Sequence, residues 1–553
     1  MTTLRSLRAA GPLAVAVLCL GAGTASAQLT ADTAQRIDAV FARLDHTNGP
    51  GCVLGVDRDG QPLYRKAYGL ASLEFRVPLT VDSRLESGSV AKQFVAAAIV
   101  LLSQEGKVDH DAPVQRYLPE LPDYGSPVTV RMLLHHTSGV RDMWTLFELA
   151  GQGMGTRLFT MDQALRMIVR QRELNFPPNS DYLYSNSGFL LLADIVERTS
   201  GEPLASFSAH RFFEPLGMHR TQWRDHWNRM VPDRATAYSP AAGGYERAAP
   251  FMDVYGAGGL LTTVGDLLIW NEQLTHPKIG GRTLVEAMET PAVLTTGRTV
   301  NYGLGLSLAT FHGTREVSHG GATGGYRTFV ARWPDRGLSM AVICNVANAG
   351  PDGLAHRVAD ILMGTAPTEA LAAEAAAAHP LTADLAAFEG LYRNPATEEV
   401  IRIVRRDSTL VADVGVEVPL RSAGERRFRL GSAELRFDLP AGGRSAGLVR
   451  VGSDDEVRFE AVRMAPPPAS ELSSYTGRYY SDELDATYEI GVRDGRLQMT
   501  RPDGDPAALD PTAPATFANP EGALRFTRTK GRIDGFALFA GRVRNLRFTR
   551  QRP

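Results

Sequence analysis

Several residue types are scarce in this chain, and each scarcity argues against a class of protein. Three cysteines among 553 residues are too few for a disulfide-rich secreted scaffold. Acidic and basic residues nearly cancel, with a formal net charge of -2, so composition gives no support for a nucleic-acid partner. The chain is 44% hydrophobic and 22% charged, which is the composition of a globular protein. At this length two or three domains are expected.

Long apolar runs are absent beyond the amino terminus. Residues 1–27 combine Arg5 and Arg8, a short apolar core and the small-residue site Ala25-Ser26-Ala27, a pattern typical of a signal peptide. The apolar core is shorter than the ~20 residues that a membrane-spanning helix needs, although a retained anchor is the alternative. We therefore expect an exported protein, periplasmic in a bacterium or secreted, with no membrane span after removal of residues 1–27.

Two cysteines remain in the expected exported chain. Cys52 and Cys344 each lie in a strand-like apolar run, where a buried free thiol is the more common state. A disulfide between them is the alternative, and sequence alone does not decide between the two.

Residues 28–364 are predicted to form an α/β domain. Alternating apolar and polar residues flank an Asp59-Gly60 turn, which indicates a β-hairpin. The pattern is mainly helical from residue 87 to about 250, returns to strands over 301–345 and ends with a helix near 352–364. A sheet built from both ends of the segment, with helices inserted between them, is therefore expected.

The rest of the chain is predicted to contain two related β-rich domains. After an alanine-rich linker at 365–384, "LAAFEGLY" (385–392) matches "LSSYTGRY" (472–479) at four positions. The two copies, 385–464 and 470–553, are each long enough for a small all-β, barrel-like domain.

Lysine is also scarce, with only five among 59 basic residues. One of them, Lys92, stands three residues after Ser89 at the start of an apolar run, and this spacing places both side chains on one face of a helix. A buried lysine can lose its proton and act as a base toward a serine, whereas arginine stays protonated. Ser89 and Lys92 are thus a candidate nucleophile and base. The alternative is an ordinary helix start with an exposed lysine.

Two further motifs carry polar side chains that fit this chemistry. Tyr184 and Asn186 stand two apart just before a predicted helix, so their side chains point the same way. A tyrosine can transfer protons, and an amide can hold a substrate carbonyl. His319 begins "HGGATGG" on a predicted strand, where glycines let a ligand approach the backbone. His135 and His136 lack the spaced partners that a zinc site requires.

The ordered set S-x-x-K, Y-S-N and H-x-G resembles the penicillin-recognising serine hydrolases, which include class C β-lactamases, DD-carboxypeptidases, D-aminopeptidases and related esterases. The resemblance covers about residues 32–364. It implies a β-lactamase/transpeptidase-like α/β domain, with an antiparallel sheet flanked by helices and a helical subdomain. It also implies that Ser89 is the nucleophile, Lys92 its base, Tyr184 a second proton shuttle and Asn186 a contact to the substrate amide.

The same resemblance assigns the H-x-G strand to substrate binding. His319 would replace a lysine that many relatives have there, and it would lie beside Gly321. The backbone N–H groups of Ser89 and Ala322 would form the oxyanion hole. A histidine carries less positive charge than lysine at neutral pH, which puts strong binding of a β-lactam carboxylate in doubt.

The domain order favours one activity. Two carboxy-terminal β-barrels and an H-x-G strand resemble D-aminopeptidases, in which a loop from the barrel region reaches the active site; residues 501–522 are the candidate loop. We expect an exported D-aminopeptidase-like enzyme acting on a small or short-peptide substrate of cell-wall origin, with no cofactor or metal, as a monomer or homodimer. A β-lactamase, an esterase for small esters and a non-catalytic cell-wall-binding protein with a vestigial site are the alternatives.

Overall fold

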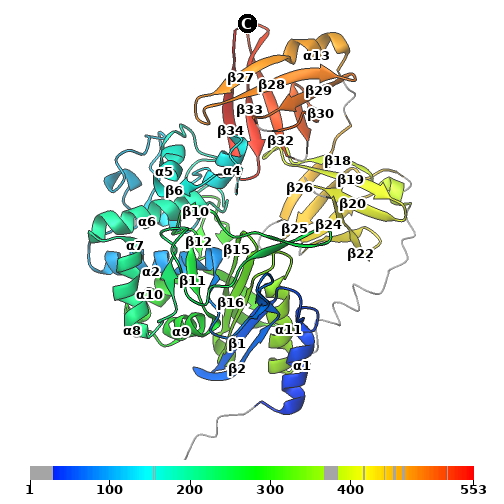
Figure 1. Ribbon diagram of the computed structural model, residues 1–553. Helices are drawn as coiled ribbons and strands as arrows, with labels where there is room; N and C mark the ends of the chain where they lie inside the picture. Colours follow the sequence, from blue (N-terminus) through cyan, green and yellow to red (C-terminus); the bar gives the residue numbers. More distant parts are fainter. Residues whose placement is uncertain are drawn as a thin grey trace, which may run out of the picture.

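The computed structural model describes residues 29–365 and 384–552, except 154, 156, 415–416, 432, 441–442, 453–455, 464–466, 503 and 520. The predicted signal peptide and nearly all of the predicted linker lie outside the described residues. Figure 1 shows an α/β domain followed by two β-rich parts, so the predicted architecture is confirmed. None of the helices in the described ranges is long and apolar enough to cross a membrane.

An antiparallel six-stranded sheet forms the centre of the α/β domain, in the order β14-β15-β16-β17-β1-β2. The amino-terminal hairpin therefore joins strands from the end of the domain, as predicted. The strands are β1 (Cys52–Arg58), β2 (Gln61–Tyr68), β14 (Ser307–Phe311), β15 (Thr314–Thr323), β16 (Tyr326–Trp333) and β17 (Leu338–Cys344).

Helices cover both faces of this sheet. Helix α1 (Ala31–Phe41) and helix α11 (Pro351–Met363) bury apolar side chains with Trp333 and Met340 of the sheet. Helix α9 (Val264–Thr275) packs with Val53 and Ile343 on the other side. Successive strand residues alternate between faces, so a continuous apolar strand such as β17 is buried by helices on both sides.

Cys52 and Cys344 form a disulfide in the structure, so the expectation of two free thiols is wrong. The residues lie opposite each other on the neighbouring strands β1 and β17, and both are fully buried. They are 292 residues apart in the chain, and only the strand order of the folded sheet brings them together.

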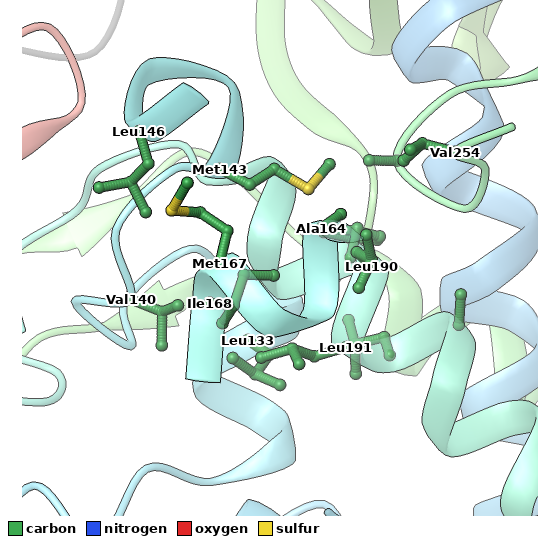
Figure 2. Packing of buried hydrophobic residues seen from close by; sticks show 14 of the residues in the cluster. Leu133, Val140, Met143, Leu146, Ala164, Met167, Ile168, Leu190, Leu191 and Val254 are labelled. Carbon is green, nitrogen blue, oxygen red and sulfur yellow. The ribbon is translucent and has the colours of Figure 1, made fainter. Parts of the chain in front are cut away.

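The helices inserted between the strands form a second layer around α2 (Lys92–Gln104), which is buried from Lys92 to Leu102. A helix that is apolar all round must be enclosed on every side. Figure 2 shows Leu133, Met167 and Leu190 packing in this layer. The other helices are α3 (Val130–Leu134), α4 (Met143–Leu149), α5 (Met161–Val169), α6 (Asn186–Ser200), α7 (Leu204–Ser208), α8 (Glu214–Leu216) and α10 (Gly281–Met288).

The two carboxy-terminal parts differ in closure. The first forms an open sheet in the order β21-β20-β19-β18-β26-β25-β24-β23-β22, and the second closes into a barrel from β27 to β34. The open sheet contains β18 (Gly390–Arg393), β19 (Val400–Arg406), β20 (Thr409–Asp413), β21 (Glu417–Pro419), β22 (Arg421–Gly424), β23 (Arg427–Leu430), β24 (Ala433–Asp438), β25 (Gly447–Val451) and β26 (Glu456–Ala461). The barrel contains β27 (Gly477–Ser481), β28 (Ala486–Arg493), β29 (Arg496–Thr500), β30 (Ala507–Ala513), β31 (Thr516–Asn519), β32 (Gly522–Thr529), β33 (Arg532–Ala540) and β34 (Val543–Arg550).

The sequence repeat corresponds to a repeated contact at the start of each β-rich part. The buried hydroxyl of Tyr392 donates to the Phe388 carbonyl at 2.8 Å. The matching Tyr479 donates to the Tyr475 carbonyl at 2.6 Å. The matching tyrosines of the repeat thus have the same structural role, which is to tie the start of each β-rich part to its first strand.

The closed barrel packs directly onto the helical layer. Tyr488 and Phe548 of the barrel belong to the same apolar cluster as Leu146 and Ile168 of the helices. At the edge of this contact the fully buried Arg141 donates to Glu483 at 2.8 Å. The barrel is therefore an integral part of the wall around the helical layer.

Candidate active site

Ser89 and Lys92 lie where the 3-10 turn η1 (Gly88–Ala91) leads into α2. Ser89 belongs to the turn, and Lys92 is the first residue of the helix. The Lys92 amine nitrogen Nζ lies 3.1 Å from Ser89 Oγ, and Lys92 is 0% exposed. The structure therefore excludes the alternative of an exposed lysine at an ordinary helix start.

Two hydrogen bonds to the protein orient the Lys92 amine so that its third position points at Ser89. Nζ donates to Asn186 Oδ1 at 2.9 Å and to the Ala257 carbonyl at 2.6 Å. Both partners are acceptors only, because the amide nitrogen of Asn186 is directed at Asp142. A neutral amine has two hydrogens for these acceptors and a lone pair for the proton of Ser89.

Burial lowers the pKa of Lys92 well below its usual value. Among nearby charges, Asp142 raises the pKa and Arg542 lowers it. Lys92 forms no ion pair with any described carboxylate, so the neutral amine is favoured. This is the protonation state in which a lysine can accept a proton from a serine.

Tyr184 lies beside the same two residues. Its ring centroid is 4.8 Å from Lys92 Nζ and 4.1 Å from the ring of His136. Burial raises the pKa of Tyr184, while Ser89 and Arg542 act in the opposite direction. The buried hydroxyl forms no hydrogen bond of normal geometry with a described residue. A bound substrate atom could supply that missing partner.

Asn186 is the first residue of α6, and its side chain is held at both ends. Its Oδ1 accepts from Lys92, and its Nδ2 donates to Asp142 Oδ2 at 2.8 Å. Its backbone N–H donates to the same Asp142 oxygen at 2.7 Å. Asn186 thus positions Lys92, and its contact to a substrate amide stays a prediction.

Asp142 was not identified from the sequence. It lies immediately before α4, and its Oδ1 accepts from the backbone N–H groups of Trp144 and Thr145. An aspartate before an apolar run could have been recognised as a helix N-cap. Its second role, holding Asn186 from 44 residues away, has no local signal.

His319 lies on β15 and is neutral. Its Nδ1 is 2.6 Å from the Gly320 carbonyl and therefore carries the hydrogen, while Nε2 accepts from the Tyr302 hydroxyl at 3.0 Å. Burial lowers the pKa of His319 to about 4. The expectation that histidine brings little positive charge to this strand is thus supported. Tyr302, which sets its orientation, was not identified from the sequence.

The neighbouring His135 and His136 are buried too. Burial lowers the pKa of His135 to about 4 and lowers the pKa of His136 well below its usual value. His136 Nδ1 accepts from the Ser185 backbone N–H at 3.1 Å, which fixes the loop that carries Tyr184. No cluster of His, Cys, Asp and Glu able to hold a metal ion occurs in the described part of the chain.

Strand β15 approaches the catalytic turn closely enough to require glycine on both sides. A Cβ on Gly321 would lie 2.0 Å from the Ser87 carbonyl oxygen, and one on Gly88 would lie 2.5 Å from Ala322 N. Gly88 also has a positive φ of 54°, which disfavours other residues. This approach brings the backbone of Ala322 next to the turn that carries Ser89, as an oxyanion hole requires.

These groups line a pocket of about 770 Å³. Its lining includes all the predicted site residues except Lys92, which lies beneath Ser89: Ser89, Tyr184, Asn186, His319, Gly321 and Ala322. The barrel contributes Arg542, from the turn between β33 and β34. The choice of residues 501–522 as the loop at the site is wrong, since no described residue of that segment lines the pocket.

The same pocket contains a buried ion pair that sequence patterns did not reveal. Arg224 Nε is 3.0 Å from Glu86 Oε2, and the two side chains are 2% and 0% exposed. Glu86 lies on β5 (Leu85–Glu86), which pairs with β11 (Leu260–Thr262) just before the catalytic turn. The pair thus anchors the segment that leads to Ser89.

Comparisons with known proteins agree with this geometry. A family model described as Beta-lactamase matches residues 37–363. A D-aminopeptidase from Cereibacter sphaeroides is 29% identical over 465 residues, which are 83% of this chain and 86% of the relative. A D-aminopeptidase from Brucella anthropi is 28% identical over 451 residues, which are 79% of this chain and 80% of the relative.

Two solved structures share the fold. The octameric penicillin-binding protein homologue from Pyrococcus abyssi has a TM-score of 0.58 at 21% identity, covering 85% of this chain and 98% of that one. The D-amino acid amidase from Ochrobactrum anthropi SV3, complexed with D-phenylalanine, has a TM-score of 0.52 at 23% identity, covering 61% of this chain and 100% of that one.

Proposed function

Since the chain belongs to the beta-lactamase family and is a serine hydrolase, we propose that it is an exported D-aminopeptidase-like enzyme. Its substrate would be a short peptide, or a peptide amide, that begins with a D-residue. The single observation that carries the proposal is the buried Lys92 amine, 3.1 Å from Ser89 Oγ, at a pocket that a barrel turn helps to enclose.

The proposed reaction has two steps. Ser89 Oγ attacks the scissile carbonyl carbon while its proton moves to Lys92, and the oxyanion is held by the N–H groups of Ser89 and Ala322. The carbon–nitrogen bond breaks as the leaving nitrogen receives a proton through Tyr184, leaving an acyl-serine. Water then attacks the acyl carbon, gives its proton to the Lys92–Tyr184 pair, and Ser89 is released with its hydrogen.

Features of the pocket support a small substrate with a free amino terminus. The barrel wall restricts length on the side of Arg542. Asp352, at the start of α11, also lines the pocket and forms no ion pair with another described residue. Its carboxylate would complement a substrate ammonium group. The D-aminopeptidase relatives match this chain beyond the hydrolase domain, over about four-fifths of its length.

Export is part of the proposal and rests on two supports. Residues 1–27 have the pattern of a signal peptide. The disulfide between Cys52 and Cys344 is of the kind that persists in oxidising compartments.

The proposal is tested by the rates of hydrolysis of D-Ala-p-nitroanilide, its L-enantiomer, nitrocefin and p-nitrophenyl acetate. The expected result is cleavage of the D-anilide with a clear preference over the L-anilide, and complete loss of every activity in Ser89→Ala. Cleavage of nitrocefin or of the ester alone would favour the β-lactamase or esterase alternative. Inertness toward all four, with no labelling of Ser89 by a fluorophosphonate, would leave the cell-wall-binding alternative.

A further inference from the structure

Arg542 reaches the catalytic pocket from the far end of the chain. It occupies the turn between β33 and β34 of the closed barrel and lines the same pocket as Ser89 and Tyr184. Its guanidinium carbon lies 4.9 Å from the centroid of the Tyr184 ring, and its side chain is 44% exposed. The helical layer holds this turn in place, because Asn175 Nδ2 donates to the Arg542 carbonyl at 3.0 Å.

The guanidinium of Arg542 has unused hydrogen-bond donors. It donates no hydrogen bond to any described residue, and its ion pair with Asp142 is long, at 3.8 Å. The Asp142 oxygens are already occupied: Oδ2 accepts twice from Asn186, and Oδ1 accepts from two backbone N–H groups of α4. The planar fork of N–H groups on Arg542 is thus available to a ligand, and its geometry matches a carboxylate.

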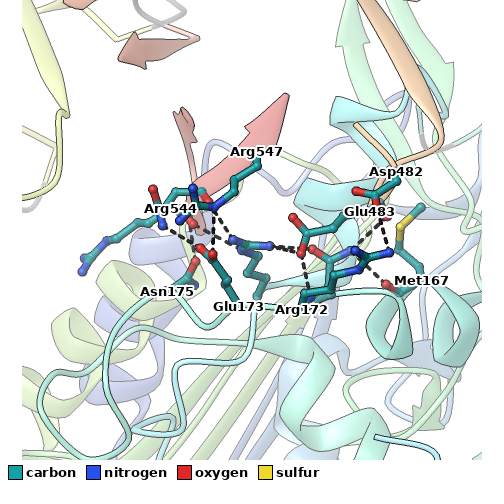
Figure 3. Close-up of polar contacts among 11 residues, drawn as sticks. Met167, Arg172, Glu173, Asn175, Asp482, Glu483, Arg544 and Arg547 are labelled. Carbon is teal, nitrogen blue, oxygen red and sulfur yellow. Dashed lines mark hydrogen bonds and ion pairs between the residues drawn. The ribbon is translucent and has the colours of Figure 1, made fainter. Parts of the chain in front are cut away.

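Neighbouring arginines of the barrel are used differently. Arg544 donates to Asp181 at 3.0 Å, and Arg547 donates to Glu173 at 2.7 Å. Figure 3 shows Arg544, Arg547 and Glu173 at this contact between the barrel and the helical layer. These two arginines hold the barrel in place, whereas Arg542 faces the pocket without such a partner.

The other cationic side chains at the pocket are committed to the protein. Arg224 donates to both oxygens of Glu86 and to the Met252 carbonyl. Arg327 donates to the Gly324 and Tyr326 carbonyls from one nitrogen. His319 is neutral, and Lys92 must be neutral to act as a base. Among the described cationic side chains of this pocket, Arg542 is therefore the one whose guanidinium donates no hydrogen bond to the protein.

We propose that Arg542 binds a carboxylate on the leaving group of the substrate, which makes a dipeptide with an amino-terminal D-residue the preferred class. The leaving nitrogen must lie against Tyr184, which supplies its proton, and Arg542 lies beside that ring. In a dipeptide the carboxylate is attached one carbon beyond the leaving nitrogen. The choice of a D-peptide as substrate rests on the proposed function. The placement of the leaving group on the Arg542 side of the pocket rests on the serine hydrolase mechanism.

The experiment compares matched substrates with and without a carboxylate in the leaving group. One pair is D-Ala-Gly and D-Ala-Gly amide, and the other is 4-carboxyphenyl acetate and phenyl acetate. In Arg542→Ala, kcat/KM for the carboxylate member should fall relative to its neutral partner by about 10- to 100-fold, mainly through KM, as expected for loss of one charge-assisted contact. Arg542→Lys should keep part of the ratio, and Arg547→Ala, which removes a docking arginine, should keep all of it.

The ratio separates substrate binding from proton transfer. Arg542 also affects the pKa values of Lys92 and Tyr184, and such an effect changes the rates of both members of a pair by a similar factor, so it cancels in their ratio. Ratios in Arg542→Ala that equal the wild-type ratios in both pairs would overturn the proposal. The proposal would also be overturned if Arg327→Ala lost the preference for the carboxylate substrates while Arg542→Ala kept it. If wild type cleaves the esters but neither D-peptide, the proposed D-aminopeptidase function fails, and the ester pair still decides the role of Arg542.

Discussion

A lysine ammonium costs several kcal/mol to bury without a carboxylate partner, so the position of Lys92 demands an explanation beyond packing. Its three contacts are a serine hydroxyl, an amide oxygen and a backbone carbonyl. These suit a neutral amine, which explains why a chain that otherwise uses arginine keeps lysine here.

Replacing Lys92 by arginine should abolish most catalysis, because a guanidinium does not give up its proton near neutral pH. For Lys92→Arg and Lys92→Ala we expect kcat for p-nitrophenyl acetate to fall by about 10²- to 10⁴-fold, the usual contribution of a general base. Burst kinetics would show whether acylation is the slowed step. Activity of Lys92→Arg within tenfold of wild type would contradict the assignment.

Buried histidines make stability depend on pH. The pKa values of His135 and His319 are lowered to about 4 in the folded protein, from about 6.5 in an unfolded chain. As pH falls below 6.5 the unfolded chain takes up protons that the folded protein refuses, so stability is lost between pH 6.5 and 4. Each histidine accounts for up to about 3 kcal/mol of this loss.

Urea denaturation at pH 7.5, 5.5 and 4.5 measures this loss directly. In His135→Gln and His319→Gln the fall in unfolding free energy with acidification should be smaller than in wild type. A pH dependence identical to wild type in both variants would contradict the neutral, buried state of these side chains.

At this scale the sequence predicted the candidate catalytic residues that the structure brings together, but not the residues that hold them in place. Ser89 with Lys92, and Tyr184 with Asn186, each fall within a few residues of one another, so short patterns reveal them. Tyr302, Asp142 and Arg542 act on residues that are distant in sequence. Their roles arise from the fold, which a local pattern does not contain.

Among the elements, the close approach of β15 to η1 brings the backbone of Ala322 beside Ser89, where the proposed oxyanion hole would form. A side chain at 321 would collide with the Ser87 carbonyl, whereas a Cβ on Gly320 would meet nothing closer than the Thr328 carbonyl at 3.9 Å. Position 320 therefore has room for a side chain, whereas position 321 does not.

Gly321→Ala should separate the strand from the catalytic turn. We expect its kcat for every acyl substrate to fall by about 10²- to 10³-fold, as when one oxyanion-hole donor is lost. Gly320→Ala is the matched control and should retain activity. Equal rates for the two variants, both folded by circular dichroism, would show that the close approach is not needed for catalysis.

The strands and helices themselves were largely predictable from periodicity, including the Asp59-Gly60 hairpin and the strands of 301–345. For the sheet, the sequence predicted only that strands from the two ends of the domain would join, and not the order in which they lie. The Cys52–Cys344 disulfide depends on register, because only the alignment of β1 with β17 places the two sulfurs together. A buried apolar run carries no information on register with a distant strand.

On the scale of the whole molecule, the closed barrel and the helical layer share one apolar core and a buried ion pair. Arg141 is 0% exposed and Glu483 is 4% exposed. Arg141 also donates to the carbonyls of Arg544 and Asn545. The repeat in the sequence predicted a second β-rich domain, but its docking surface depends on side chains that look ordinary in the sequence.

Arg141→Met should destabilise the protein by about 3–5 kcal/mol, because it leaves the Glu483 carboxylate buried and unpaired. Arg547→Ala removes a more exposed pair and should cost at most about 1 kcal/mol. Guanidinium denaturation of both variants measures the difference. In the double variant Arg141→Met/Glu483→Gln, part of the lost stability should return. Equal losses of stability in Arg141→Met and Arg547→Ala would contradict the docking role of the Arg141–Glu483 pair.

The position of β1 in the sheet also has a consequence for synthesis. Its two neighbours are β2 and β17, so one edge of the amino-terminal hairpin has no partner until the chain has been made as far as Cys344. An open, apolar strand edge is the surface on which unfinished chains associate with one another. Cys52 and Cys344 are 292 residues apart in the chain, so most of the α/β domain has to be made before this edge is covered.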